Sequence, residues 1–153
     1  MTFFAFEADF VQSLRCIPMQ VRYKLDTCGV KLKLAHWHDL TAEERQQLVA
    51  LPCGGPEDAV LYRDYLQGRV TAHTGAAAGT LPIDPNPPWA EEDHIPEAVT
   101  QKLQESGQIL SSSQWASLSP LQRFALIKLS RPSHENRNFV PALQEFLDDS
   151  VAG

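Results

Sequence analysis

The five histidines could in principle hold a metal ion, but their spacing does not favour one. His36 and His38 are two residues apart, so on a helix their side chains would point about 200° apart and could not easily share an ion. His73, His94 and His134 are scattered, and the chain has no H-E-x-x-H motif and no pair of CxxC motifs with zinc-like spacing. We therefore predict ordinary surface histidines, with no metal site and no cofactor.

The three cysteines are the candidate nucleophiles. An odd number without a CxxC motif favours reduced thiols over a disulfide framework. Cys28 lies on the apolar stripe of a predicted helix, where a free cysteine behaves as a small hydrophobic residue, and Cys53 lies in a turn. Cys16 follows Arg15, a positive neighbour that could lower its pKa. No local signature of a Cys/His/Asp set or a phosphate-binding loop accompanies them, so we predict no catalytic residues and a protein that is not an enzyme.

The elements that hold these residues occur twice. At an offset of 78 residues, twelve of the 35 positions from Ile17 to Leu51 are identical, where background composition would give roughly two or three. The identical pairs are Ile17/Ile95, Pro18/Pro96, Val21/Val99, Lys24/Lys102, Leu25/Leu103, Gly29/Gly107, Leu32/Leu110, Trp37/Trp115, Leu40/Leu118, Arg45/Arg123, Leu48/Leu126 and Leu51/Leu129. We predict an all-α fold built from an internally duplicated unit of about three helices, the two copies packed face to face with pseudo-two-fold symmetry.

The repeated positions indicate where each helix begins and ends. A proline in the first turn and a glycine after the last turn frame the first helix of each copy. Capping boxes at Thr41–Glu44 and Ser119–Gln122 start the second helix. The third helix begins at Pro56, with an apolar face formed by Leu61, Tyr62, Tyr65 and Leu66, and at the same offset its counterpart brings Phe139, Val140 and Leu143 onto Leu61, Tyr62 and Tyr65.

We predict one domain over residues 1–153, in which the repeats 17–74 and 95–150 are joined by residues 75–94. This joining segment contains four prolines and four acids without a Lys or Arg, which predicts an extended linker. The alternating run Val30–Leu34 is the one strand-like pattern, and its counterpart does not alternate.

Residues shared by the copies are expected to be structural, and residues present in one copy are expected to carry function. Trp37, Trp115, Arg45 and Arg123 are therefore predicted to be structural. The first copy adds an aromatic N-terminal segment and a more charged first helix, and aromatic residues, Met and Arg are enriched at protein interfaces. The predicted partner-binding residues are Phe6, Glu7, Arg15, Cys16, Met19, Arg22 and Asp26. The alternative is that the phenylalanines cover the core and the charges are solvated.

Charge and hydropathy exclude several partners. The net charge of −6 argues against nucleic acid or an anionic membrane as the main partner. Residues 1–38 nevertheless contain five Lys/Arg and three Asp/Glu, so a basic face, if the chain has one, is built there. No run of about 18 apolar residues could span a membrane, and the N-terminus lacks the features of a signal peptide. We expect a cytoplasmic protein.

The segment from Phe6 to Asp26 (FEADFVQSLRCIPMQVRYKLD), followed by Gly29–Leu32, Trp37 and Glu44–Arg45, resembles the nitrate reductase-associated proteins of cyanobacteria. The resemblance implies a small accessory protein, encoded among genes for nitrate assimilation and the molybdenum cofactor, that an active ferredoxin-dependent nitrate reductase requires. It implies no catalytic residues. Three roles stay open: an accessory protein or maturation chaperone that binds the reductase, a docking aid for ferredoxin, and a carrier of the molybdenum cofactor.

Overall fold

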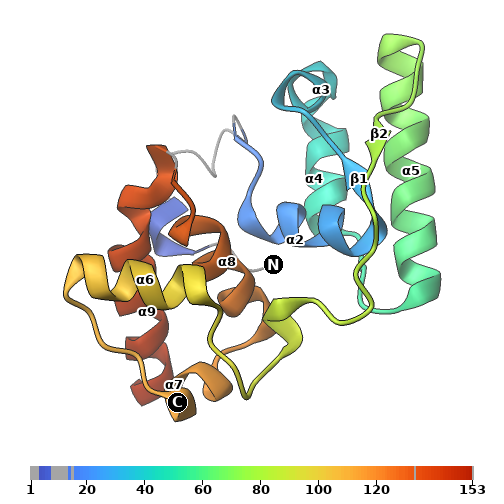
Figure 1. The fold of residues 1–153 in the computed structure, drawn as a ribbon. Coiled ribbons are helices and arrows are strands. Elements are labelled where there is room, and N and C mark those ends of the chain that lie inside the picture. Colours follow the sequence, from blue (N-terminus) through green and yellow to red (C-terminus); the bar gives the residue numbers. More distant parts are fainter. Residues whose placement is uncertain (1–3, 8–13, 15, 133, 153) are drawn as a thin grey trace. The chain divides into compact units, whose positions relative to one another are not determined.

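The computed structural model describes residues 4–7, 14, 16–132 and 134–152. Over these residues the chain is mostly helical, as predicted, with eight α-helices and one two-stranded sheet (Figure 1). The backbone divides into two compact units. Unit 1 contains Glu7–Asp84, and unit 2 contains Phe4–Phe6 together with Pro85–Gly153.

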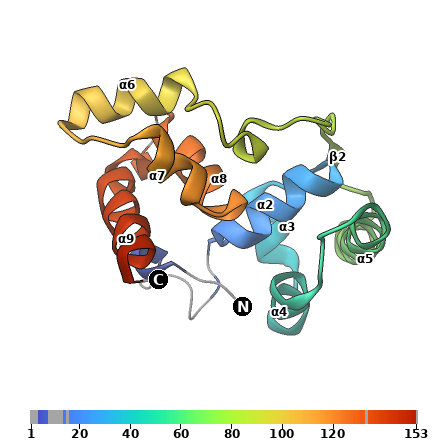
Figure 2. The same cartoon turned by 90° about the horizontal axis from the view of Figure 1, so that it is seen from below.

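The elements of unit 1 are α2 (Met19–Cys28), β1 (Val30–Lys31), α3 (Leu34–Asp39), α4 (Ala42–Ala50), α5 (Pro56–Thr74) and β2 (Gly79–Thr80). A single turn of 3-10 helix, η1 (Ala5–Glu7), precedes them in the chain. The long helix α5 packs against α2, α3 and α4, and Figure 2 views it nearly end-on. The core between these helices is centred on Val21, Trp37, Leu48, Tyr62 and Leu66, each at most 1% exposed.

The elements of unit 2 are η2 (Pro88–Ala90), α6 (Glu97–Ser106), α7 (Ser112–Ser117), α8 (Pro120–Ser130), η3 (His134–Asn138) and α9 (Phe139–Ala152). Helix α8 is central, because η2, α6, η3 and α9 all pack against it. Figure 2 shows α6 and α9 apart from each other, each beside α8. The N-terminal residues 4–6 belong to this unit: the Phe4 ring lies 4.8 Å from the Phe146 ring, and the Ala5 N–H donates to the Glu145 carboxylate at 2.8 Å.

The 78-residue offset extends to the ends of the helices. Helices α6 and α7 begin and end 78 residues after α2 and α3, and α8 begins 78 residues after α4. The glycines that end α2 and α6, Gly29 and Gly107, both adopt the left-handed conformation, with φ of 78° and 68°. Such a backbone disfavours any residue with a Cβ, which explains why glycine occurs at both positions. Thr41 and Ser119 accept the N–H of the third helical residue, as the predicted capping boxes require.

The third helices do not follow this offset. Leu61 was predicted on the apolar face of α5, but it is 68% exposed, whereas Tyr62, Leu66 and Val70 are buried. Phe139, which the offset places on Leu61, is fully buried. The prediction that Leu61 lies on the buried face of α5 was therefore wrong, and Phe139 has no buried counterpart at the 78-residue offset. Composition could not reveal which residue is buried, because Leu61 and Tyr62 are both large and apolar.

The segment 75–94 is more than a linker. Its first part pairs with unit 1: Val30 lies opposite Thr80 and Lys31 opposite Gly79 in an antiparallel ladder, which the all-α prediction did not include. Its second part packs in unit 2, where the Trp89 ring meets the Phe124 ring edge-on at 5.0 Å. Leu81 donates its N–H to the Gly29 carbonyl at 2.8 Å, so the chain reversal at Gly29 is what brings β1 to β2.

Candidate functional sites

The predicted partner-binding residues of the N-terminal segment lie in different environments. Arg15 and the side chain of Phe6 lie outside the described residues, and the backbone of Phe6 belongs to unit 2. Glu7 and Met19 are buried, and the Glu7 carboxylate accepts the Met19 N–H at 2.9 Å. Met19 begins α2, where backbone N–H groups lack partners within the helix and favour a negative charge. Glu7 therefore stabilises the start of α2, and neither side chain is exposed for contact with a partner.

The other three predicted contact residues, Cys16, Arg22 and Asp26, are half-buried. The Arg22 guanidinium donates through Nε to the Ile17 carbonyl at 3.0 Å, which fixes the first part of its side chain. No residue of α2 is classed as exposed, whereas α6 exposes the corresponding Thr100 and Gln104. Among the predicted contact residues whose side chains the structure describes, Cys16, Arg22 and Asp26 are the ones that solvent or a partner can partly reach.

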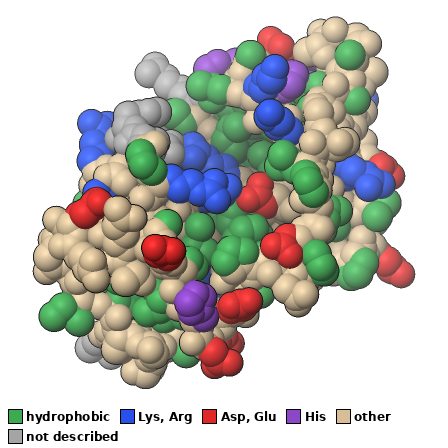
Figure 3. Space-filling view, in the orientation of Figure 1, with side chains coloured by type: hydrophobic (Ala, Val, Ile, Leu, Met, Phe, Trp, Pro, Cys, Tyr) green, Lys and Arg blue, Asp and Glu red, His purple; other side chains and the backbone are tan. Residues whose placement is uncertain are grey.

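A more exposed charged surface lies on β1 and α3. This β1–α3 surface consists of Lys31, Lys33, Leu34, His36 and His38. Lys31, Lys33 and His38 are exposed, Leu34 is 49% exposed, and His36 is half-buried with its Nδ1 accepting the Lys33 N–H at 3.1 Å. Figure 3 shows Lys, Arg and His side chains gathered over α3. The predicted basic face of residues 1–38 is thus located on this surface.

The corresponding positions of unit 2 carry no charge. They are Ile109, Ser111, Ser112, Gln114 and Ala116, of which Ile109 is 85% exposed. Helices α3 and α7 begin and end at equivalent positions. The two surfaces therefore differ in their side chains and not in the extent of the helices that carry them. The β1–α3 surface is therefore a feature of unit 1 alone among these equivalent positions.

The paired lysines Lys24 and Lys102 also occupy different sites. In unit 1 the Lys24 ammonium donates to the carbonyls of Val49 and Leu51, at 2.7 and 2.6 Å, and thereby caps the C-terminal end of α4. It also lies 5.7 Å from the centre of the Tyr62 ring, whose hydroxyl donates to Leu48 at 2.7 Å. Burial lowers the pKa of Lys24, and the charge of Cys53 opposes that shift. Lys24 is thus a half-buried lysine whose ammonium is bound by backbone carbonyls of unit 1.

Two thiols complete the Lys24 site. Cys28 is 2% exposed and Cys53 is 6% exposed. The Cys28 thiol contacts the Leu25 carbonyl at 3.7 Å, and the Cys53 thiol contacts the Lys24 carbonyl at 3.7 Å. Interaction with Cys28, followed by the charge of Lys24, lowers the pKa of Cys53 despite its burial, whereas interaction with Cys53 and burial raise the pKa of Cys28. The sequence did not indicate that Cys53 lies beside Lys24; Arg15, the positive neighbour that the sequence gives Cys16, lies outside the described residues.

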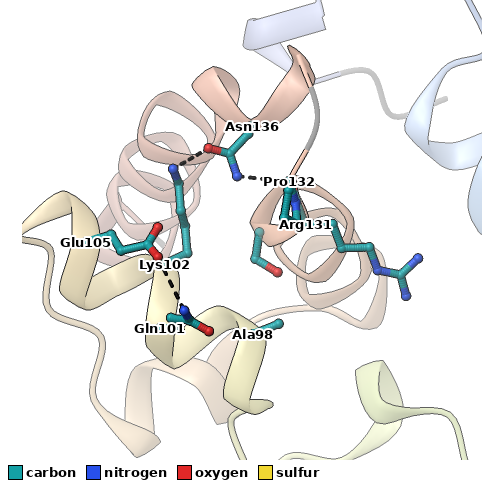
Figure 4. Close-up of a pocket in the computed structure, with 8 residues that line it drawn as sticks. Ala98, Gln101, Lys102, Glu105, Arg131, Pro132 and Asn136 are labelled. Atoms are coloured by element: carbon teal, nitrogen blue, oxygen red, sulfur yellow. Dashed lines mark hydrogen bonds between the residues drawn. The ribbon is translucent and has the colours of Figure 1, made fainter.

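In unit 2 an open cavity of about 230 Å³ lies beside Lys102, the residue that corresponds to Lys24 (Figure 4). Asn136 donates to the carbonyls of Leu129 and Arg131 at the end of α8, and Lys102 donates to the Asn136 side chain instead of reaching the helix end. Glu105 and Gln101 also line the cavity and are hydrogen-bonded to each other, while Figure 4 shows the Arg131 guanidinium pointing away. The cavity is smaller than the 300–1,000 Å³ common for ligand pockets.

Glu44, on α4, forms a cluster of charged groups with two residues of α5, His73 and Arg69. Its carboxylate caps Thr41, lies 2.7 Å from His73 Nε2 and lies 3.7 Å from the Arg69 guanidinium. Burial acts to raise the pKa of Glu44, but hydrogen bonds from Thr41 and His73 outweigh it, so the pKa lies below its usual value. Gln122 occupies the equivalent position in unit 2 and caps Ser119 in the same way, so the charge of Glu44 serves the pair with α5 and not the cap itself.

Of the four residues predicted to be structural, Trp37, Trp115 and Arg123 are buried and Arg45 is half-buried. Trp37 and Trp115 are fully buried, and each indole N–H donates to a backbone carbonyl, that of Leu14 at 2.7 Å and that of Glu91 at 2.9 Å. Arg45 donates to the carbonyls of Trp37 and His38, both at 2.9 Å. Arg123 is buried and donates to four carbonyls, those of Trp89, Trp115, Ala116 and Leu118. Each arginine therefore joins the end of the tryptophan helix to the next helix.

Two general features bear on the kind of protein this is. Within the ranges that the structure describes, no group of three or more His, Cys, Asp or Glu side chains could hold a metal ion. Over the same ranges, no helix is long and apolar enough to cross a membrane. The protein is thus a small helical protein with two similar units, of which unit 1 carries a basic surface and two buried thiols.

The comparison with protein families identifies the chain more closely. The family model of the conserved nitrate reductase-associated proteins matches residues 3–146, and the chain belongs to this family. No curated protein and no solved structure matches the chain. The resemblance that the sequence suggested at the family level is therefore confirmed.

Proposed function

We propose that this protein is a non-catalytic, cytoplasmic accessory protein that binds a ferredoxin-dependent molybdenum nitrate reductase and supports its maturation or activity in nitrate assimilation. The family description, nitrate reductase-associated, supports association with that enzyme. The observation that carries the binding role is the β1–α3 surface, which is positive in unit 1 where the equivalent surface of unit 2 is neutral.

The chemistry of the β1–α3 surface favours an acidic patch on the partner. Two exposed lysines, Lys31 and Lys33, precede Leu34, an exposed leucine that can add apolar contact. In a chain with a net charge of −6, a local positive surface orients an approaching acidic partner and keeps it away from the acidic remainder. A partner that binds one form of the reductase stabilises that form by mass action, which is how an accessory protein without catalytic residues can raise activity.

Cys16, Arg22 and Asp26, with Arg15 from the neighbouring segment, form a second proposed contact on unit 1. The support for it is the difference between the copies, since Arg22 and Asp26 correspond to Thr100 and Gln104. The two proposed contacts are tested separately, because Arg22 belongs to α2 whereas Lys31 belongs to β1 and Lys33 directly precedes α3.

The test is a binding titration between this protein and purified nitrate reductase at two salt concentrations. We expect Lys31→Glu combined with Lys33→Glu to weaken binding at least tenfold, and binding of the unmodified protein to weaken as salt rises. The matched control changes the equivalent positions of unit 2, Ile109→Glu with Ser111→Glu, and leaves the affinity unchanged. Equal effects of both double variants, or tight binding that ignores salt, would refute the assignment to this surface.

Arg22→Glu tests the second contact, with Thr100→Glu as its control at the equivalent position of α6. Because Arg22 also donates to the Ile17 carbonyl, the thermal unfolding of both variants is recorded alongside binding. We expect weaker binding for Arg22→Glu without loss of the folded state. Unchanged affinity would remove this contact from the proposal and leave the β1–α3 surface in place.

We also propose that the two units arose by duplication of one helical unit. The support is the shared 78-residue offset of helix ends, glycine conformations and capping boxes. An experimental structure in which the backbone of α2–α4 fails to superpose on that of α6–α8 would contradict the duplication.

The basic β1–α3 surface also favours a second candidate, a docking aid for ferredoxin, because ferredoxins of this kind are typically acidic. The two roles differ in the electron donor that matters. A docking aid would raise ferredoxin-driven activity in a salt-dependent way and leave activity with an artificial donor unchanged, whereas an accessory protein of the reductase raises both. The cavity at Lys102 gives little support to the third role, carriage of the molybdenum cofactor, since it is smaller than pockets for ligands of that size.

A further inference from the structure

Two of the three cysteines lie side by side although 24 residues separate them in the chain. Cys28 is the last residue of α2, and Cys53 lies in the turn between α4 and α5. Their sulfurs contact the carbonyls of Leu25 and Lys24, which are consecutive on α2, and both side chains belong to the same buried core cluster. The two sulfurs therefore share one site at the C-terminal end of α2, where a disulfide could join them if the side chains rotate toward each other.

The surroundings make the two thiols chemically unequal. Lys24 holds its ammonium at the end of α4 by donating to Leu51, two residues before Cys53. A positive charge favours the thiolate, which is the reactive form of cysteine. Cys53 is flanked by Pro52 and Gly54, both exposed, so a small reagent needs to pass little protein to reach it. Cys28 is enclosed by the core of unit 1 and is available mainly to Cys53.

The pair has no counterpart in unit 2. At the 78-residue offset Cys28 corresponds to Ser106 and Cys53 corresponds to Arg131. Ser106 donates its hydroxyl to the Lys102 carbonyl at 2.7 Å, so a small polar residue satisfies the helix end there. The end of this helix can therefore be completed without a thiol. We look for the role of the two thiols of unit 1 in their chemistry.

We propose that Cys28 and Cys53 form a peroxide-sensitive pair that is oxidised to an intramolecular disulfide, with Cys53 as the attacking thiol and Cys28 as the resolving thiol. The Cys53 sulfur attacks one oxygen of hydrogen peroxide, the O–O bond breaks, and one water leaves, which produces a sulfenic acid. The Cys28 sulfur then attacks the Cys53 sulfur, the S–O bond breaks, and a second water leaves. Two thiols and one peroxide thus give one disulfide and two waters, and a dithiol reductant reverses the change by thiol–disulfide exchange.

The bridge would close a loop that contains β1, α3 and α4. This loop carries the β1–α3 surface, so the oxidised form holds that surface on a more constrained backbone. Here the inference rests on the proposed function, because the bridge would then link the redox state of the cell to the partner-binding surface. The formation of the disulfide itself does not depend on any partner.

The test uses the full chain alone, reduced and then treated with one equivalent of hydrogen peroxide. Remaining thiols are blocked with N-ethylmaleimide, and the protein is digested and analysed by mass spectrometry. We expect a peptide pair joined through Cys28 and Cys53, a single maleimide at Cys16, and a higher thermal unfolding midpoint that dithiothreitol returns to its starting value. Free thiols at Cys28 and Cys53, or oxidation that begins at Cys16, would overturn the proposal.

Variants separate the roles of the thiols. Cys16→Ser should form the bridge at the rate of the unmodified protein, because Cys16 takes no part. Cys28→Ser should stop at the sulfenic acid of Cys53, which a dimedone probe labels, whereas Cys53→Ser should show little labelling of Cys28. Equal labelling of the two single variants would contradict the order of attack. Since no reductase is present, failure here leaves the binding proposal standing, and failure of binding leaves the disulfide standing.

Discussion

The equivalent lysines Lys24 and Lys102 are predicted to stabilise the chain unequally. Lys24 donates to two backbone carbonyls that end α4, and Lys102 donates to one side-chain amide. Replacing each lysine by methionine removes the charge and its hydrogen bonds but keeps most of the aliphatic stem. The two variants therefore compare the same substitution at positions that the repeat makes equivalent.

The expected magnitudes follow from the hydrogen bonds that each variant loses. A hydrogen bond to a charged group contributes about 1.5–3 kcal/mol net, and the two bonds of Lys24 share one cation, so Lys24→Met should lower the free energy of unfolding by about 2–4 kcal/mol. Asn136 keeps its own bonds to the end of α8 when Lys102 is changed. Lys102→Met should therefore cost about 1 kcal/mol or less, since water in the cavity can replace the lost partner.

The assay is urea denaturation followed by circular dichroism, with the free energy of unfolding obtained by linear extrapolation. The two variants are compared by the ratio of their losses in free energy of unfolding, because errors of extrapolation affect both variants alike. A loss for Lys102→Met that equals or exceeds the loss for Lys24→Met would refute the reasoning that the lysine sites have diverged.

Three further outcomes are expected. Glu44→Gln keeps the cap, as Gln122 shows, but loses the pair with His73, so it should be about 1 kcal/mol less stable than the unmodified protein at pH 7. Because the pKa of Glu44 is lowered on folding, its stabilisation is present above about pH 4.3 and is lost as the pH falls through the folded pKa, so the two stability–pH curves should converge in acid, and parallel curves would contradict this. Gly29→Ala should cost more than Gly107→Ala, since a Cβ at Gly29 would lie 2.8 Å from a backbone oxygen while one at Gly107 meets nothing within 4 Å, and equal melting temperatures would contradict it. Trp115→Ala should cost about 3–5 kcal/mol by denaturant titration, because the ring is fully buried and its indole is hydrogen-bonded.

The helices of both units could be predicted from local signals. Proline just before the helix, glycine after its last turn and the two capping boxes act within a few residues, and the repeat doubled each signal. The register of the third helices could not be predicted in this way. Leu61 and Tyr62 are both apolar, and the packing of the whole unit decides which of them is buried.

The candidate sites were harder to predict than the helices, because most of them depend on contacts between residues that are far apart in the chain. Glu7 is charged and near the N-terminus, and its burial against the start of α2 has no local signature. Cys28 and Cys53 meet because α4 returns the chain to the end of α2, which spacing alone does not reveal. The β1–α3 surface did have a signal in the sequence, because Lys31 and Lys33 align with Ile109 and Ser111 at the 78-residue offset.

The central claim is that this protein binds nitrate reductase directly. The decisive measurement is size-exclusion chromatography with light scattering on a mixture of the protein with purified reductase, both cofactor-free and cofactor-loaded, at tens of micromolar. The account predicts a complex of defined mass that Lys31→Glu with Lys33→Glu abolishes. A preference for the cofactor-free enzyme indicates a role in maturation, and a preference for the loaded enzyme indicates a lasting subunit. Separate elution of the two proteins in both mixtures would contradict the account.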